Sequence, residues 1–128
     1  MTPFSTIVKD AHSSLQNAAG TTVRYLRDGS EKVADLKAVP ANSRFEQDTS
    51  SGVTVRFDMQ DFLVSADDLV DGDAGFEPEV GDTIEWTREG ATRSFQVLSP
   101  GGAAQAWEYR DPSRELIRIH TRFTEIVV

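Results

Sequence analysis

Alternation of apolar and polar residues with a period of two is the feature that most constrains how this chain can fold. The last clear run places Ile117, Ile119, Thr121 and Phe123 on one face of an extended strand, and Arg118, His120 and Arg122 on the other. We therefore expect one face of this strand to meet a core and the other to meet water or a partner.

Similar runs fill the chain from residue 21 onward. The stretch Ser94–Phe123 is typical of a β-meander, because turn signals at Pro100–Gly102 and Asp111–Ser113 separate its alternating runs. We expect its last strand to close the fold. Further strands are expected at residues 21–26, 32–39, 53–65, 83–88, 91–99 and 107–109.

Several signals between these runs predict turns or breaks. Arg27–Ser30 and Glu89–Gly90 are typical of hairpin turns. Pro40–Ser43 predicts an interruption of pairing, and Gln47–Gly52 predicts a loop or a hairpin tip. The alternation changes phase at Gln60 and Asp61, which predicts a bulge or a bend.

A helical spacing of apolar residues precedes the strands. Phe4, Ile7, Val8, Ala11 and Leu15 follow this spacing, and they predict a helix over residues 3–18. The fold class is therefore mainly β: a small antiparallel β-barrel or sandwich with one N-terminal α-helix and long loops. Residues 1–128 form a single domain, with the β-barrel over 21–126 and an acidic loop at 66–80.

Composition excludes several classes of site. The chain has no cysteine and only two histidines, so disulfides, thiolate metal sites and a histidine-rich zinc site are excluded. No apolar run approaches the roughly 20 residues of a membrane span, and no secretion signal is expected. The acidic segment fails the register of a calcium loop, because Leu69 and Pro78 fall where ligands are needed. We expect no cofactor and no metal.

Charge is unevenly distributed. The net charge is −8, and residues 46–89 hold thirteen Asp and Glu against two Lys and Arg. Such a surface repels phosphate, which argues against sequence-specific nucleic-acid binding. It suits a surface past which DNA slides, but from the charge alone ordinary solubility charge is the favoured interpretation.

No catalytic constellation stands out. His120 has Asp111 and Glu115 nearby in sequence but no serine in a strained turn, and charge pairing across strands is the simpler interpretation. The aromatic residues Trp86, Trp107 and Tyr109 allow a carbohydrate or base platform, but aromatic side chains in short strands more often belong to a core. We expect no enzyme.

A succession of motifs occupies about residues 60–122: Phe62–Leu69, Gly81–Ile84, Phe95–Gly102, Trp107–Pro112 and Leu116–Thr121. This succession resembles the small neck proteins of tailed bacteriophages. The chain departs from that pattern at Ser113, where an aromatic residue is usual, and at Phe95, where tyrosine is usual.

This resemblance implies a head-tail connector, or head-closure (stopper), subunit in the virion neck, synthesised in the host bacterial cytoplasm. It implies a sixfold or twelvefold homo-oligomeric ring that contacts portal or adaptor and tail proteins, and through which DNA passes without sequence-specific binding. No membrane is involved. A ring needs two unlike contact patches. The candidate interaction residues are Asp67, Asp68, Asp71 and Asp73 on the acidic loop, and Arg110, Arg114, Arg118 and Arg122 near the last strand.

Other functions stay open. A tail terminator or another minor tail protein belongs to the same class. A cellular small β-barrel that binds a protein or glycan through Trp107 and Tyr109 belongs to a different class. A hydrolase with acidic catalytic residues is the least favoured.

Overall fold

The structure, a computed structural model, describes residues 20–48, 50–101 and 105–127. Within these ranges the chain forms strands and a short 3-10 turn, η1 (Ala66–Asp68). The strands are β1 (Thr21–Arg27), β2 (Ser30–Asp48), β3 (Thr54–Ser65), β4 (Val70–Asp71), β5 (Ala74–Gly75), β6 (Thr83–Arg88), β7 (Ala91–Val97), β8 (Trp107–Tyr109) and β9 (Leu116–Val127). The fold is therefore mainly β, as predicted. The predicted helix over residues 3–18 lies outside the described residues, so the structure gives it no support.

Antiparallel pairing arranges most strands in the order β3-β2-β1-β6-β7-β9-β8. Strand β3 also pairs with β9, from Gln60↔Thr121 to Ser65↔Leu116. The pairings therefore form a closed circuit through β3, β2, β1, β6, β7 and β9. This confirms that the last strand closes the fold.

The C-terminal third is not a meander, which corrects the prediction. Both β7 and β8 pair with β9, and they follow one another along the edge of β9 that does not pair with β3. The amide of His120 donates to the Ala106 carbonyl (2.8 Å), and its carbonyl accepts from the Leu98 amide (3.1 Å). Leu98 and Ala106 thus bond to the same residue of β9, and the segment that joins them connects two partners of one strand.

Two hairpin turns follow from their residues as predicted. Between β1 and β2, Asp28 and Gly29 both have positive φ (53° and 78°). Between β6 and β7, Glu89 and Gly90 do too (55° and 80°). This backbone twist matches that of the flanking strands, which is why such turns make tight hairpins.

The core lies inside the circuit of strands and is rich in aromatic residues. The Phe62 ring is fully buried and lies 5.8 Å from Trp86 and 5.5 Å from Phe95, measured between ring centroids. Phe123 extends this cluster at 5.8 Å from Phe95, but it is 48% exposed. The burial of Trp86, and the packing of Trp107 and Tyr109 against the core, confirm their predicted core role.

Strand β2 continues through Pro40, which corrects the predicted interruption. Pro40 pairs with Phe62, and the β2–β3 register runs without a shift from Val39↔Leu63 to Asp48↔Thr54. The pairing of β2 with β1 ends at Ala38, which lies opposite Thr21, the first residue of β1. At Pro40 β2 therefore no longer has β1 as a neighbour. A proline without an N–H group is tolerated where a strand has a neighbour on one side only.

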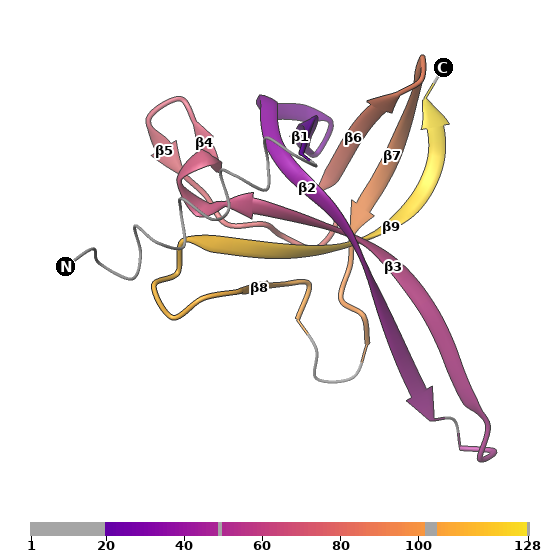
Figure 1. The fold of residues 1–128 in the computed structure, drawn as a ribbon. Coiled ribbons are helices and arrows are strands. Elements are labelled where there is room, and N and C mark those ends of the chain that lie inside the picture. Colours follow the sequence, from indigo (N-terminus) through magenta and orange to yellow (C-terminus); the bar gives the residue numbers. More distant parts are fainter. Residues whose placement is uncertain (1–19, 49, 102–104, 128) are drawn as a thin grey trace.

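The far parts of β2 and β3 form a two-stranded arm that projects from the rest of the sheet (Figure 1). We call residues 41–48 and 54–60 the arm. Its tip lies within the predicted Gln47–Gly52 segment, which confirms a hairpin tip there. Of the bulge or bend predicted at Gln60 and Asp61, the bulge is wrong, because β3 stays in register with both β2 and β9 at these residues.

Candidate functional site

The root of the arm holds a buried carboxylate that the sequence analysis did not single out. Asp61 on β3 is fully buried and lies opposite His120 on β9. One carboxylate oxygen lies 2.9 Å from His120 Nδ1, and the other accepts a hydrogen bond from Arg118 Nε at 2.5 Å. The Ser43 hydroxyl of β2 also donates to Asp61. Three strands thus meet at one carboxylate, and we call these four residues the root cluster.

The electrostatics of the root cluster favour a charged Asp61. Burial by itself raises the pKa of this carboxyl group. The hydrogen bonds from His120, Ser43 and Arg118 outweigh burial and hold the pKa below its ordinary value. Asp61 is therefore an anion that binds the Arg118 guanidinium and the His120 ring of β9 and the Ser43 hydroxyl of β2.

The arm itself covers the root cluster. Phe45 of β2 meets the His120 ring edge to face, with 5.3 Å between centroids, and His120 is only 6% exposed. Arg118 also donates to the Asn42 carbonyl of β2 at 3.1 Å. The pairing predicted for His120 is confirmed, but the face that was expected to meet water or a partner is covered here by the chain's own arm.

The hydrogen-bond pattern of the root cluster differs from that of a Ser-His-Asp triad. In such a triad the serine hydroxyl bonds to the histidine, which acts as its base. Here Ser43 and His120 both bond to the Asp61 carboxylate. A carboxylate whose pKa is lowered is also a poor base for a serine hydroxyl, so this arrangement is suited to holding strands together.

A hollow of about 320 Å³ lies beside the root cluster. Its lining includes Arg44, Arg110, Arg118 and His120, with Glu108 as the one acid among the lining residues. Arg44 lies 3.1 Å from Asp58, and Arg110 lies 3.9 Å from Glu108. The lining cations therefore already have carboxylate neighbours, and the hollow is a mixed polar surface.

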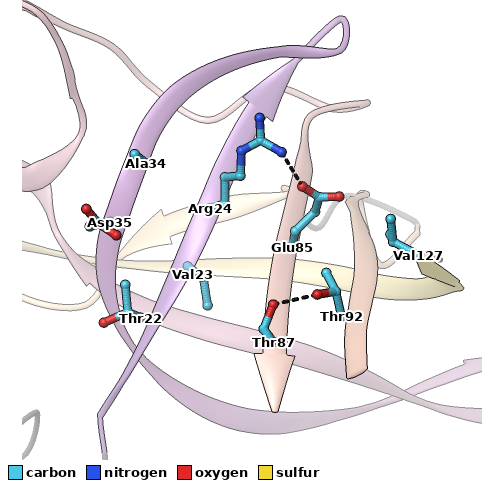
Figure 2. A pocket seen from close by; sticks show the side chains of 9 residues that line it. All are labelled: Thr22, Val23, Arg24, Ala34, Asp35, Glu85, Thr87, Thr92 and Val127. Atoms are coloured by element: carbon cyan, nitrogen blue, oxygen red, sulfur yellow. Dashed lines mark hydrogen bonds and ion pairs between the residues drawn. The ribbon is translucent and has the colours of Figure 1, made fainter. Parts of the chain in front are cut away.

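A second hollow, of about 420 Å³, lies over β1, β2, β6 and β7 (Figure 2). Arg24 reaches across to Glu85 at 2.9 Å, and Thr87 faces Thr92 at 2.6 Å. Figure 2 shows these pairs bridging neighbouring strands. The polar groups of this hollow stabilise the sheet and do not converge on a common point.

The acidic segment is anchored to the sheet by Asp82. This residue, 2% exposed, accepts hydrogen bonds from the Tyr25 hydroxyl, from Arg27 (2.9 Å) and from the Glu79 amide (2.9 Å). Burial raises the pKa of Asp82, but the bonds from Arg27, Tyr25 and Glu79 more than compensate and lower it. Phe76 packs on Tyr25 with 5.4 Å between ring centroids. The acidic segment therefore returns to the body at a fixed position.

The predicted acidic residues gather at one end of the molecule. Asp67 and Asp68 lie on η1, Asp71 on β4 and Asp73 in the β4–β5 turn, and all four are exposed. Asp71 lies 3.3 Å from Lys32. Figure 1 places the β4–β5 hairpin at the opposite end of the molecule from the arm tip. No cluster of possible metal ligands occurs in residues 20–48, 50–101 and 105–127.

The predicted arginines do not form one patch. Arg118 belongs to the root cluster, and Arg114 lies over the Tyr109 ring at 5.6 Å. Arg110 follows β8, and Arg122 lies on the exposed end of β9. Whether these residues contact a partner stays a prediction.

Sequence reasoning missed Asp61, although a signal for it was present. The change of phase at Gln60 and Asp61 reflects a strand that is buried on both faces, with Met59 and Asp61 on one and Phe62 and Val64 on the other. A buried acid in such a strand needs partners. Their identity depends on the register with β9, which the sequence does not reveal.

None of the described helical segments is long and apolar enough to cross a membrane. No curated protein matches the chain. A family model described as "Phage head-tail joining protein" matches residues 5–127, nearly the whole chain. The chain therefore belongs to the phage head-tail joining protein family, and is a virion component that connects head and tail at their junction.

Proposed function

We propose that this protein is a head-closure (stopper) subunit, which assembles into a homo-oligomeric ring between the portal or adaptor and the tail. In this proposal the closed circuit of strands is a small β-barrel that serves as the rigid body of the subunit. The family supplies the location at the head-tail junction. The assembly of a ring and its role in closing the head are what we propose beyond the family.

The observation that carries the proposal is the arm. Among the described strands, β2 pairs only with β3 after Ala38, and the β3 residues before Gln60 pair only with β2. These two segments leave the rest of the sheet. A two-stranded hairpin alone in water is only marginally stable. An arm that is fastened at its root by Asp61 and extends into solvent is therefore suited to burying its far part against another protein.

The charge distribution supports a ring through which DNA passes. The acidic residues Asp67, Asp68, Asp71 and Asp73 lie at the end opposite the arm tip. If this end faces the channel, its charge keeps DNA from adhering as it passes.

We propose that the protein acts by contact and not by catalysis. This is consistent with the hydrogen bonds of Ser43 and His120, which both go to the Asp61 carboxylate.

A complementation experiment tests this function. A phage that lacks the gene is supplied with the wild-type protein, or with a variant in which Asp67, Asp68, Asp71 and Asp73 are all replaced by asparagine. We expect the variant to give heads that lose DNA or lack tails, seen by electron microscopy and by nuclease-sensitive DNA. As a control, Asp28→Asn removes an exposed acid elsewhere. Fully infectious virions with the fourfold variant would contradict the channel role.

The ring is tested separately. Purified protein is mixed with portal, and its stoichiometry is measured by native mass spectrometry. Several copies per portal are expected. Binding to tail tubes but not to portal would instead indicate a tail terminator.

A further inference from the structure

The end of β9 carries an open strand edge. Strand β9 pairs with β7 as far as Thr92↔Val127, whereas its pairing with β3 ends at Gln60↔Thr121. Among the described residues no strand pairs with the second edge of Arg122–Val127. All residues of this stretch are exposed, including Phe123 (48%) and Ile126 (54%).

This edge is only partly protected. Natural proteins guard open edges with charged side chains, above all lysine, with proline or with very short strands, because an open edge otherwise pairs with another chain. The stretch Arg122–Val127 carries the charged residues Arg122 and Glu125 but neither lysine nor proline, and Phe123 and Ile126 are exposed on it. Its apolar side chains are therefore suited to being covered.

The structure also contains a strand that matches this edge. Inside the chain, Gln60–Ser65 and Leu116–Thr121 pair antiparallel and without a register shift. Continuing this register places Thr54–Met59 along Arg122–Val127, over an equal length. In the structure these two stretches diverge from the last pair, Gln60↔Thr121. Thr54–Met59 lies in the arm, and Arg122–Val127 runs toward the β6–β7 hairpin (Figure 1). The pairing is therefore begun within the chain and not continued.

We propose that the arm of a second copy of this chain completes the pairing, with its β3 segment Thr54–Met59 added antiparallel to the open edge of β9. This inference rests on the proposed ring and names its subunit contact. An extended segment adds readily to an open sheet edge, because main-chain hydrogen bonds supply the contact.

The proposed contact also has the symmetry that a ring needs. The arm of one copy binds the β9 edge of the next, whose own arm stays available for a third copy. Such a head-to-tail contact joins unlike surfaces and propagates until the rotation closes. The root cluster sets the direction of the arm, because Asp61 joins Ser43 of the arm to Arg118 and His120 of β9.

Cysteine pairing tests the register directly, since the natural chain has no cysteine. Thr54 and Val127 would lie opposite each other in the continued register, and both are exposed. Opposed residues have Cα atoms about 4.5–5.5 Å apart, within reach of a disulfide. Mixing Thr54→Cys protein with Val127→Cys protein, in the presence of portal, should give a disulfide-linked dimer that the mixture of Thr54→Cys with Asp73→Cys does not give.

A variant with both Thr54→Cys and Val127→Cys distinguishes pairing between two copies from pairing within one chain. With both cysteines in the same chain, the proposal expects disulfide-linked multimers on non-reducing gels. A monomer with an internal disulfide would show that the two stretches pair inside one subunit, and would overturn the proposal.

Charges placed on the edge provide a second test. Ile126→Glu with Val127→Lys guards the edge, and glutamate is chosen at 126 because Arg93 lies opposite. We expect self-association on portal to weaken by at least about tenfold, the effect of losing one anchoring contact. Val80→Glu, at another exposed apolar residue (63%), is the matched control and should assemble normally.

The outcomes distinguish this contact from the ring itself. A ring that forms normally with the guarded edge and without the Thr54–Val127 disulfide would overturn the contact and leave the proposed function intact. If wild-type protein does not oligomerise on portal, the ring fails as well. Assembly that is normal on portal but lost with tails would assign the edge to a tail protein, which also overturns the proposal.

Discussion

Asp61 and His120 lie opposite each other on β3 and β9, with carboxylate Oδ1 and imidazole Nδ1 2.9 Å apart at the point where these strands begin to diverge. Ser43 and Arg118 bind the same carboxylate. A single buried charge thus joins the body of the sheet to the arm. The stability of the fold and the direction of the arm both depend on it.

Replacing Asp61 by alanine should destabilise the protein by about 2–3 kcal/mol, because hydrogen bonds to a buried charged group are lost and their donors are left without an acceptor. Urea unfolding followed by tryptophan fluorescence measures this change. Asp58→Ala is the matched control on the same strand, because Asp58 and Arg44 are both about two-thirds exposed and such a pair contributes little. Equal effects of the two substitutions would show that the root cluster is not important for stability.

Stability should decrease in acid. Asp61 and Asp82 both have a lowered pKa in the folded state, so their contribution is fully present above the ordinary carboxyl pKa of about 4. It is lost as the pH falls from there through the lowered folded values. The free energy of unfolding should therefore drop below about pH 4, and less steeply in Asp82→Asn than in the wild type. An unchanged slope in this variant would argue against the anchoring role of Asp82.

Tyr25 should not ionise in the folded protein. Burial, and then the hydrogen bond to Asp82, raise the pKa of its hydroxyl well above the ordinary value. Tyr25→Phe should therefore leave the alkaline absorbance titration of the native protein at 295 nm unchanged. The titration of the unfolded protein in denaturant should lose one tyrosine. A smaller native titration in the variant would contradict the burial of this hydroxyl.

Phe62 is central to the aromatic core, and Phe62→Ala should cost about 3–5 kcal/mol. The ring is fully buried between Trp86 and Phe95, so its removal leaves a cavity that these rings cannot fill completely. Chemical denaturation measures the loss, and near-ultraviolet circular dichroism should show a change around Trp86. Val80→Ala, at a residue 63% exposed, should stay within about 0.5 kcal/mol of the wild type.

Local patterns were sufficient to predict much of the fold. Alternation located the strands and the buried faces of Ile84, Trp86, Ile117 and Ile119, and the residues at Asp28 and Glu89 located two hairpin turns. These features depend on near neighbours in the chain, through strand periodicity and turn geometry. The motifs near Gly81, Trp107 and Ile117 also supported the family, which the match over residues 5–127 confirms.

Predictions that depended on distant neighbours were less successful. Pro40 was predicted to interrupt pairing, but it lies beyond Ala38, the last β2 residue that pairs with β1, where a missing N–H group is tolerated. The break in alternation at Asp61 was predicted as a bulge or a bend, but no register shift occurs there and the strand is buried on both faces.

The sequence by itself determined that this protein is built of strands with one apolar face, that it has an acidic middle segment, and that it belongs with phage neck proteins. Only the tertiary structure decided that β7 and β8 pair with the same edge of β9, that Asp61 meets His120, and that an arm and an open edge diverge from the same point. The physical reason is that alternation reports which face of a strand is buried, whereas pairing between strands far apart in sequence is selected by the packing of the whole sheet.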